Sequence, residues 1–201
     1  MPFIGSKRIG ILGGSFNPAH EGHVHISELA LERLNLDEVW WLVSPQNPLK
    51  SVTGMAPFED RMKSAEAATS AEPTIIISDF EKAHGSSRTL SSLTKLKHTY
   101  PKHQFVWLMG ADNLIQAHRW HRWTSIFNIV PIAIFARPTY SLRALSACAA
   151  KIFAGARVKE TKAGTLARMK PPAWTYLEIP LHPASSTEIR SSTEAANGKT
   201  T

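Results

Sequence analysis

The stretch that decides the fold lies near the N-terminus and reads Arg8-Ile9-Gly10-Ile11-Leu12-Gly13-Gly14-Ser15-Phe16-Asn17-Pro18-Ala19-His20-Glu21-Gly22-His23. Its apolar beginning predicts a short buried strand over residues 8–12. The two glycines that follow let the backbone turn and approach a phosphate closely. From His23 onward the apolar residues recur at helical spacing, at Ile26, Leu29, Ala30 and Leu34. The positive end of this helix then faces the glycine turn, which favours an anion there.

The rest of the chain alternates between apolar runs of strand length and segments with helical periodicity. Further strands are predicted at residues 38–43, 74–77, 104–109, 131–136 and 174–179. Helices are predicted at residues 58–69, 89–100 and 141–153, with a short last helix opening at Ser186 or Thr187. This alternation predicts an α/β fold, a Rossmann-like doubly wound parallel sheet with helices on both faces. Ligands of such sheets bind at the carboxyl ends of the strands.

Length and composition favour one globular domain over residues 1–201, since 43% of the 201 residues are hydrophobic and 19% are charged. Residues 44–57 hold three prolines and are expected to form a loop. Residues 157–170 are basic with little apolar periodicity and are expected to be a solvated connection. Cys148 is expected to be a small core residue on an Ala-rich helix.

The charge balance bears on partners and location. The formal net charge of +7 favours phosphate-bearing partners, and nucleotides qualify as well as nucleic acids. A nucleic-acid-binding module stays an alternative, although no basic stripe with interleaved aromatic residues supports it. The single cysteine, the lack of an apolar leader and the lack of a membrane-spanning run predict a cytoplasmic protein without membrane contact.

Two motifs carry the chemistry. In the first, His20 and His23 flank Gly22 at the start of the predicted helix, where both rings can donate to phosphate oxygens. Their spacing matches neither His-Glu-x-x-His nor a zinc finger, so no metal site is predicted. The second motif, residues 185–190, puts hydroxyl groups at a helix start and Arg190 one turn later, which suits another phosphate.

Together these segments resemble the HxGH nucleotidylyltransferase superfamily, over nearly the whole chain from Arg8 to Arg190. The opening resembles the pattern G-G-[ST]-F-[DN]-P-x-H-x-G-H, and the end resembles I-S-x-T-x-[IV]-R with Ala184 in place of the usual Ile. The group of bacterial nicotinate-nucleotide adenylyltransferases is the most similar, because His20 stands where the phosphopantetheine enzymes usually carry Thr.

The resemblance implies roles for particular residues. Those implied as catalytic are His20, His23 and Arg190. Those implied to bind ATP are Gly13, Gly14, Ser15, Phe16, Gly22, Gly110, Asp112, Ser185 and Thr187. Those implied to bind the mononucleotide are Lys50, Arg88, Thr89, Trp120 and Arg137. Asp112 as a plain helix N-cap, and the tryptophans as packing residues, remain alternatives.

The implied reaction joins the AMP part of ATP to nicotinate mononucleotide and releases pyrophosphate. The acceptor phosphate is mostly dianionic at neutral pH, since its second pKa is about 6, so no general base is required. Mg²⁺ is expected to bind mainly through ATP oxygens and water. Nicotinamide mononucleotide is the alternative acceptor, because Leu49, Arg88 and His121 depart from the usual residues of the group. The sequence does not determine the oligomeric state, and a homo-oligomer is one of the possible states.

Overall fold

The computed structural model describes residues 5–45, 54–86, 88–137 and 140–180. Their strands form one seven-stranded sheet in the order β3-β2-β1-β4-β5-β7-β6, and every neighbouring pair is parallel. The strands are β1 (Arg8–Gly14), β2 (Glu38–Val43), β3 (Ile75–Ser78), β4 (Gln104–Gly110), β5 (Ile132–Phe135), β6 (Arg157–Val158) and β7 (Trp174–Leu177). The predicted α/β fold with a doubly wound parallel sheet is confirmed.

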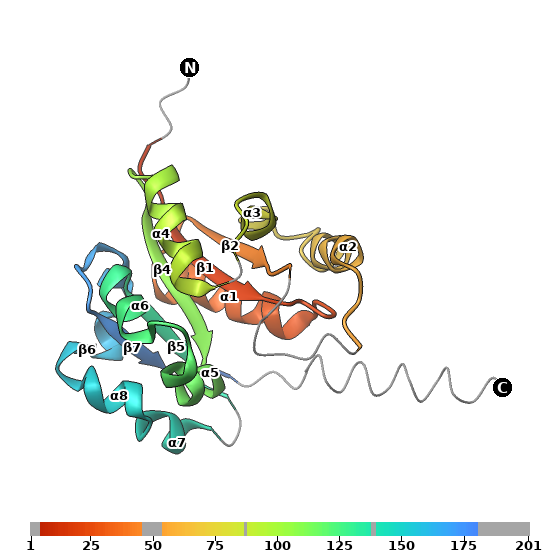
Figure 1. The fold of residues 1–201 in the computed structure, drawn as a ribbon. Coiled ribbons are helices and arrows are strands. Elements are labelled where there is room, and N and C mark those ends of the chain that lie inside the picture. The colour runs from red at the N-terminus through yellow and green to blue at the C-terminus, as the bar shows by residue number, and fades with distance from the viewer. Residues whose placement is uncertain (1–4, 46–53, 87, 138–139, 181–201) are drawn as a thin grey trace.

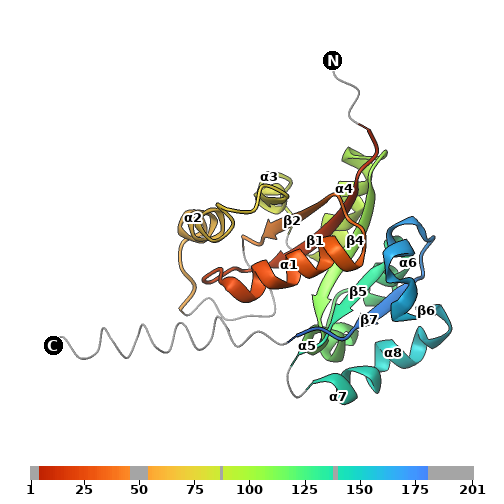
Figure 2. The ribbon, with the colours of Figure 1, turned by 180° about the vertical axis from the view of Figure 1, so that it is seen from behind.

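Helices cover both faces of the sheet (Figures 1 and 2). The helix α1 (Glu21–Arg33) crosses one face, and α4 (Thr89–Thr99) crosses the other. The remaining helical segments are α2 (Phe58–Ala68), α3 (Phe80–Ala83), α5 (Ala111–Gln116), η1 (Ala117–Arg119), α6 (Trp123–Ile129), α7 (Ser141–Leu145), α8 (Cys148–Ile152), η2 (Ala154–Ala156) and η3 (Glu160–Arg168).

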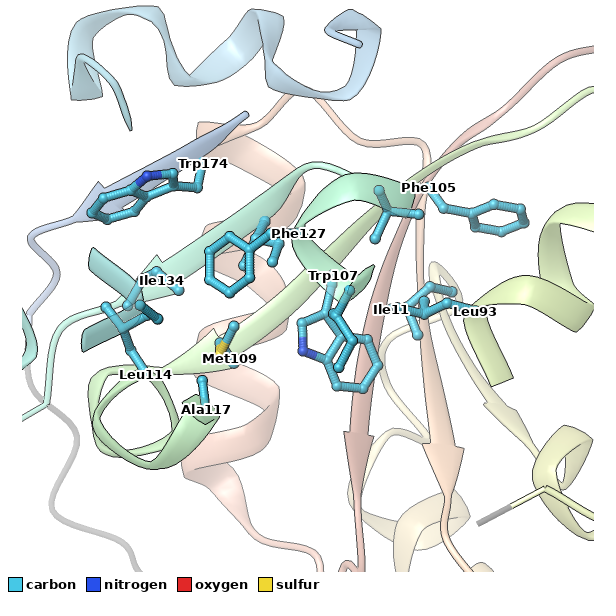
Figure 3. Packing of buried hydrophobic residues seen from close by; sticks show 14 of the residues in the cluster. Ile11, Leu93, Phe105, Trp107, Met109, Leu114, Ala117, Phe127, Ile134 and Trp174 are labelled. Carbon is cyan, nitrogen blue, oxygen red and sulfur yellow. The ribbon is translucent and has the colours of Figure 1, made fainter. Parts of the chain in front are cut away.

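Two hydrophobic clusters, one on each face, hold the layers together. Strand residues alternate between them, so Phe105, Trp107 and Met109 of β4 join one cluster while Val106 and Leu108 join the other. Figure 3 shows the first cluster, in which these strand residues meet the helices α4, α5 and α6. Because both faces of the central strands are covered, these strands read as nearly continuous apolar runs in the sequence.

The strand order creates a switch point between β1 and β4. From β1 the chain proceeds outward to β2 and β3, then returns to place β4 on the other side of β1. The helix that follows β1 and the helices that follow β4 lie on opposite faces of the sheet. The chain therefore leaves the carboxyl ends of these two adjacent strands in opposite directions. Ligands of open α/β sheets bind at such a point.

Three local expectations were wrong. Residues 157–170 are not a solvated connection, because they form β6 and η3, with Ala163, Leu166 and Ala167 buried. Cys148 is exposed, since α8 turns Ala149 and Ala150 to the core instead. The single helix expected over residues 141–153 is divided into α7 and α8.

The short last helix expected near Thr187 lies outside the described residues. Within the described ranges, no helix combines the length and the apolar character needed to cross a lipid bilayer.

Candidate functional site

The glycine turn lies at the carboxyl end of β1, beside the switch point. A Cβ atom placed on Gly13 would lie 2.4 Å from the outer edge of the Trp107 ring on β4. A Cβ atom on Gly14 would lie 3.3 Å from the Phe16 ring. The sequence therefore uses glycine at Gly13 because the indole of the neighbouring strand occupies the space of a side chain.

Phe16 is held in an unusual conformation at the tip of this turn. Its φ is +46°, a value that L-residues other than glycine rarely adopt, and its ring is buried. The ring stacks on Trp41 of β2 at 4.8 Å between centroids, and Trp41 Nε1 donates to Ser27 Oγ at 2.8 Å. Ser27 donates in turn to the carbonyl of His23 at 2.9 Å. This packing fixes the turn against the first residues of α1.

The two histidines of the first motif form a reciprocal capping box at the start of α1. His20 is the N-cap residue, and its Nδ1 accepts the backbone N–H of Gly22 at 3.1 Å. The Nδ1 of His23 accepts the backbone N–H of His20 at 3.3 Å, and the ring centroids lie 3.9 Å apart. The neutral form of a ring whose Nδ1 accepts a hydrogen bond carries its proton on Nε2. Both rings are thereby set as Nε2–H donors.

A second group lies at the carboxyl ends of β4 and β5. Arg137 Nε is 3.3 Å from Asp112 Oδ1, and a Cβ atom on Gly110 would lie within 2.8 Å of both atoms. Asp112 Oδ1 is buried and has no hydrogen-bond partner among the described residues. Gly110, not Asp112, is the N-cap residue of α5, and no side chain caps that helix end. The alternative of Asp112 as the helix N-cap is therefore wrong.

The residues implied for the mononucleotide lie on two further elements. Arg88 is the exposed N-cap residue of α4, and Thr89 is the first residue of that helix. Trp120 is the half-buried C-cap residue of η1, and it packs against the same hydrophobic cluster as Leu90. Both elements contact α6, which joins them on one side of the sheet.

Four implied residues lie outside the described residues, and the structure therefore does not place them. They are Lys50, Ser185, Thr187 and Arg190.

The sequence reasoning missed Arg61, which lies on α2 and is 2% exposed. Its guanidinium donates to four backbone carbonyls, those of Ser15 at 2.6 Å, Ser44 at 2.7 Å, Pro45 at 3.0 Å and Ala56 at 3.1 Å. Burial lowers the pKa of Arg61. Arginine joins the segment after β1 to the segment after β2 because it presents five donors in one plane. The sequence did carry a signal for its burial, because Arg61 lies one helical turn before Ala65 and therefore on the apolar face of α2.

A buried carboxyl group on α3 was also missed. Burial raises the pKa of Glu81, which is 6% exposed, while hydrogen bonds from Ser92 and Ser44 act in the opposite direction. The amide of Asn17 links the segment after β1 to the residues before α2: it donates to the carbonyl of Gly54 at 2.9 Å and accepts from the N–H of Ala56 at 3.0 Å. Polar side chains thus tie the segments around the switch point together.

No group of three or more His, Cys, Asp or Glu side chains able to hold a metal ion occurs in residues 5–45, 54–86, 88–137 and 140–180.

The fold and the site define a nucleotide-binding α/β protein of the HxGH type, with a glycine turn and a histidine-capped helix at the switch point of a parallel sheet. Comparison with known proteins specifies it further. The model of the cytidylyltransferase-like family matches residues 11–192. The chain belongs to this family and, within it, to the nicotinate-nucleotide adenylyltransferase group.

The similar proteins cover almost the whole chain. A probable nicotinate-nucleotide adenylyltransferase of Methylorubrum extorquens (strain PA1) is 49% identical over 91% of this chain and 98% of its own length. One of Parvibaculum lavamentivorans is 47% identical over 91% of this chain and 90% of its own length. The fold is similar to a Plasmodium falciparum nicotinic acid mononucleotide adenylyltransferase complexed with NaAD, with a TM-score of 0.68, 19% identity and coverage of 92% and 83% of the two chains.

Proposed function

We propose that this protein transfers the adenylyl group of ATP to nicotinate mononucleotide, which yields nicotinate adenine dinucleotide and pyrophosphate in NAD biosynthesis. The observation that carries the proposal is the histidine capping box beside the glycine turn, in a chain 49% identical to a protein named for this activity. A phosphate oxygen of the acceptor attacks the α-phosphorus of ATP in line, and pyrophosphate leaves. Catalysis of this kind requires positioning and charge stabilisation more than a protein nucleophile or base.

The histidines supply donors for the reacting phosphates. Since the capping box commits both Nδ1 atoms to backbone N–H groups, both Nε2–H groups suit a phosphate oxygen, with His23 and His20 at the α- and β-phosphates. Gly22 leaves room between them, and the positive end of α1 adds to the attraction. Further contacts to the triphosphate would come from the backbone of the glycine turn, at Gly13, Gly14, Ser15 and Phe16.

The group at β4 and β5 would serve the nucleotides. The carboxylate of Asp112, whose side chain is partly exposed, suits a ribose or base donor of ATP near Gly110. Arg137 balances the charge of this carboxylate and can offer its remaining N–H groups to the mononucleotide.

The mononucleotide would bind between the start of α4 and η1. Arg88, the Thr89 hydroxyl and the N-terminal N–H groups of α4 suit a carboxylate, and Trp120 offers an apolar surface to the pyridine ring. Lys50 would attract the phosphate of the acceptor. Arg190, with Ser185 and Thr187, would bind the phosphates that leave as pyrophosphate. Their motif would form the short C-terminal portion of a single domain over residues 1–201.

Mg²⁺ enters this proposal with ATP, bound mainly through phosphate oxygens and water, as this ion usually binds with nucleotides. When bound there, it offsets negative charge on the phosphates.

The experiment offers each mononucleotide in turn with ATP and Mg²⁺, identifies the product by mass, and compares kcat/KM at saturating ATP. A carboxylate gains charge-assisted hydrogen bonds at this site, whereas a carboxamide turns an NH₂ group toward donors. We expect nicotinate mononucleotide to be preferred by at least about tenfold. Arg88→Gln should narrow the preference, whereas Arg168→Gln, which removes an exposed charge on η3, should not. Equal values for the two mononucleotides in the wild type would contradict the assignment of the acceptor.

A further inference from the structure

Glu81 is a buried carboxyl group whose contacts are hydroxyl groups. Ser92 Oγ donates to Glu81 Oε1 at 2.6 Å. None of the ion pairs among the described residues includes Glu81. Burial of a carboxylate is unfavourable unless its oxygens receive hydrogen bonds, so this residue is retained at an energetic cost. What the carboxylate holds in place therefore matters.

The hydroxyl groups around Glu81 form a chain with a defined direction. Ser92 Oγ lies 2.9 Å from Ser86 Oγ as well as 2.6 Å from the Glu81 carboxylate. A hydroxyl carries one proton, and the ionised form of Glu81, which only accepts, takes that of Ser92. With Glu81 ionised, Ser86 is therefore the donor to Ser92. The backbone of Ser86 also donates to the carbonyl of Glu81 at 2.8 Å.

This chain of hydrogen bonds includes one residue before the start of α4 and one residue after it. Ser86 comes just before the segment with Arg88 and Thr89, and Ser92 follows within the first turn of the helix, where its N–H donates to the Arg88 carbonyl at 3.1 Å. Movement of Arg88 or Thr89 relative to α3 would strain contacts on both sides of them.

The helix that carries Glu81 also contacts β2, whose end meets the glycine turn at Ser44. The N–H of Ser44 donates to the carbonyl of Gly14 at 2.9 Å, and its carbonyl accepts from Arg61 at 2.7 Å. Ser44 thus fixes the end of β2 to the glycine turn.

We propose that Glu81 is a positioning residue that fixes the start of α4, with Arg88 and Thr89, relative to α3 and the adjoining β2, and thereby sets the affinity for the mononucleotide. It acts through Ser92 and Ser86, not by contact with the substrate. This inference rests on the proposed function, because the mononucleotide subsite is part of that proposal.

The test compares Glu81→Gln, Ser92→Ala and the double variant with the wild-type protein, with nicotinate mononucleotide and ATP varied separately. Each single variant should raise KM for the mononucleotide about fivefold or more, the effect of one lost hydrogen bond, and leave kcat and KM for ATP within about twofold. The double variant should exceed the weaker-binding single variant only slightly, since both changes break one contact. Glu66→Gln on α2 and Thr94→Ala on α4 are the matched controls, because both residues are exposed, and neither change should alter KM.

Circular dichroism and unfolding midpoints show whether each variant is folded. If Glu81→Gln does not fold, Ser92→Ala still tests the positioning role, since it removes only a single hydroxyl group. Folded variants with an unchanged KM for the mononucleotide, with an equal rise in both KM values, or with a loss confined to kcat would overturn the positioning role alone. A wild-type protein that forms no dinucleotide overturns the proposed function, and this inference with it.

Discussion

Gly13 and Trp107 lie on adjacent parallel strands in such close contact that a Cβ atom on Gly13 would be 2.4 Å from the indole ring. The ring is 4% exposed and packed within a hydrophobic cluster, so it has little room to move away. The carboxyl end of β1 can therefore approach the switch point only with glycine at this position.

Gly13→Ala should lower the free energy of unfolding by about 1–3 kcal/mol, the usual effect of forcing a methyl group into a packed core. It should also reduce turnover, because the displaced turn carries Ser15 and Phe16. Gly155→Ala is the control, since a Cβ atom there meets nothing within 4 Å. Urea unfolding of both variants measures the difference, and equal stability of the two would show that Trp107 yields easily.

His23→Ala should lower the rate of pyrophosphate release by about 10²–10³, the effect of one lost donor in an active site, about 2.7–4 kcal/mol. The loss of its capping hydrogen bond should lower stability by only about 1 kcal/mol. The protein should thus stay folded while its activity collapses. His98→Ala, which alters an exposed histidine in the last turn of α4, should retain activity. Near-normal turnover of a folded His23→Ala variant would remove His23 from the catalytic group.

The sequence predicted those parts of the fold whose signals are local. Central strands such as β1 and β4 read as apolar runs because helices cover both of their faces. The two-residue strand β6 is too short to show a period, and basic residues conceal the apolar side of η3, where Ala163, Leu166 and Ala167 are buried. Cys148 was placed in the core from composition alone, which cannot tell which face of a short helix packs.

For the site, too, the sequence predicted only the residues whose signals are local. His20, Gly22 and His23 lie within one segment, so their spacing alone predicted a shared helix start. Arg61 contacts the backbone of segments far from it in the sequence, and Glu81 contacts a hydroxyl group on another helix. No local pattern reveals such contacts, because they depend on how α2 and α3 pack beside the end of β2.

Stability at low pH should depend on the pair formed by Asp37 and Arg8 at the start of β1. Arg8 Nη2 donates to Asp37 Oδ1 at 2.7 Å, and the hydrogen bond from the Arg8 side chain lowers the pKa of Asp37 to about 2. An unfolded chain holds this carboxyl near its ordinary pKa of about 3.9. The stabilising contribution is therefore complete above that value and is lost as the pH falls through about 2.

Asp37→Asn should lower the free energy of unfolding near neutral pH by up to about 1 kcal/mol, because the pair is partly exposed and screened by solvent. The difference from the wild type should shrink as the pH falls below about 4. Urea titrations between about pH 7 and pH 3 measure it, with Asp79→Asn as an exposed control whose side chain does not cap α3. A difference that stays constant with pH would mean that the charge of Asp37 does not contribute.

The four carbonyls bound by Arg61 yield the strongest expectation for stability. Ser15, Ser44, Pro45 and Ala56 come from the two segments that follow β1 and β2, and only a side chain with several donors in one plane can reach them together. Arg61→Met retains the apolar stem but leaves these acceptors without their donors, and each buried acceptor left unpaired is unfavourable by about 1–3 kcal/mol. Because removal of the buried charge offsets part of this loss, we expect a net decrease of about 2–4 kcal/mol in the free energy of unfolding.

Arg61→Lys should recover only part of that stability, since an ammonium group presents a single centre and cannot span four acceptors. Lys63→Met, on the exposed side of the same helix, should change the free energy of unfolding by less than about 0.5 kcal/mol. In variants that stay folded, kcat/KM for ATP should fall, because the carbonyl of Ser15 loses its anchor beside the glycine turn. Denaturant unfolding and steady-state kinetics measure the two effects, and a stable, fully active Arg61→Met variant would show that water replaces the guanidinium and that Arg61 does not fix these segments.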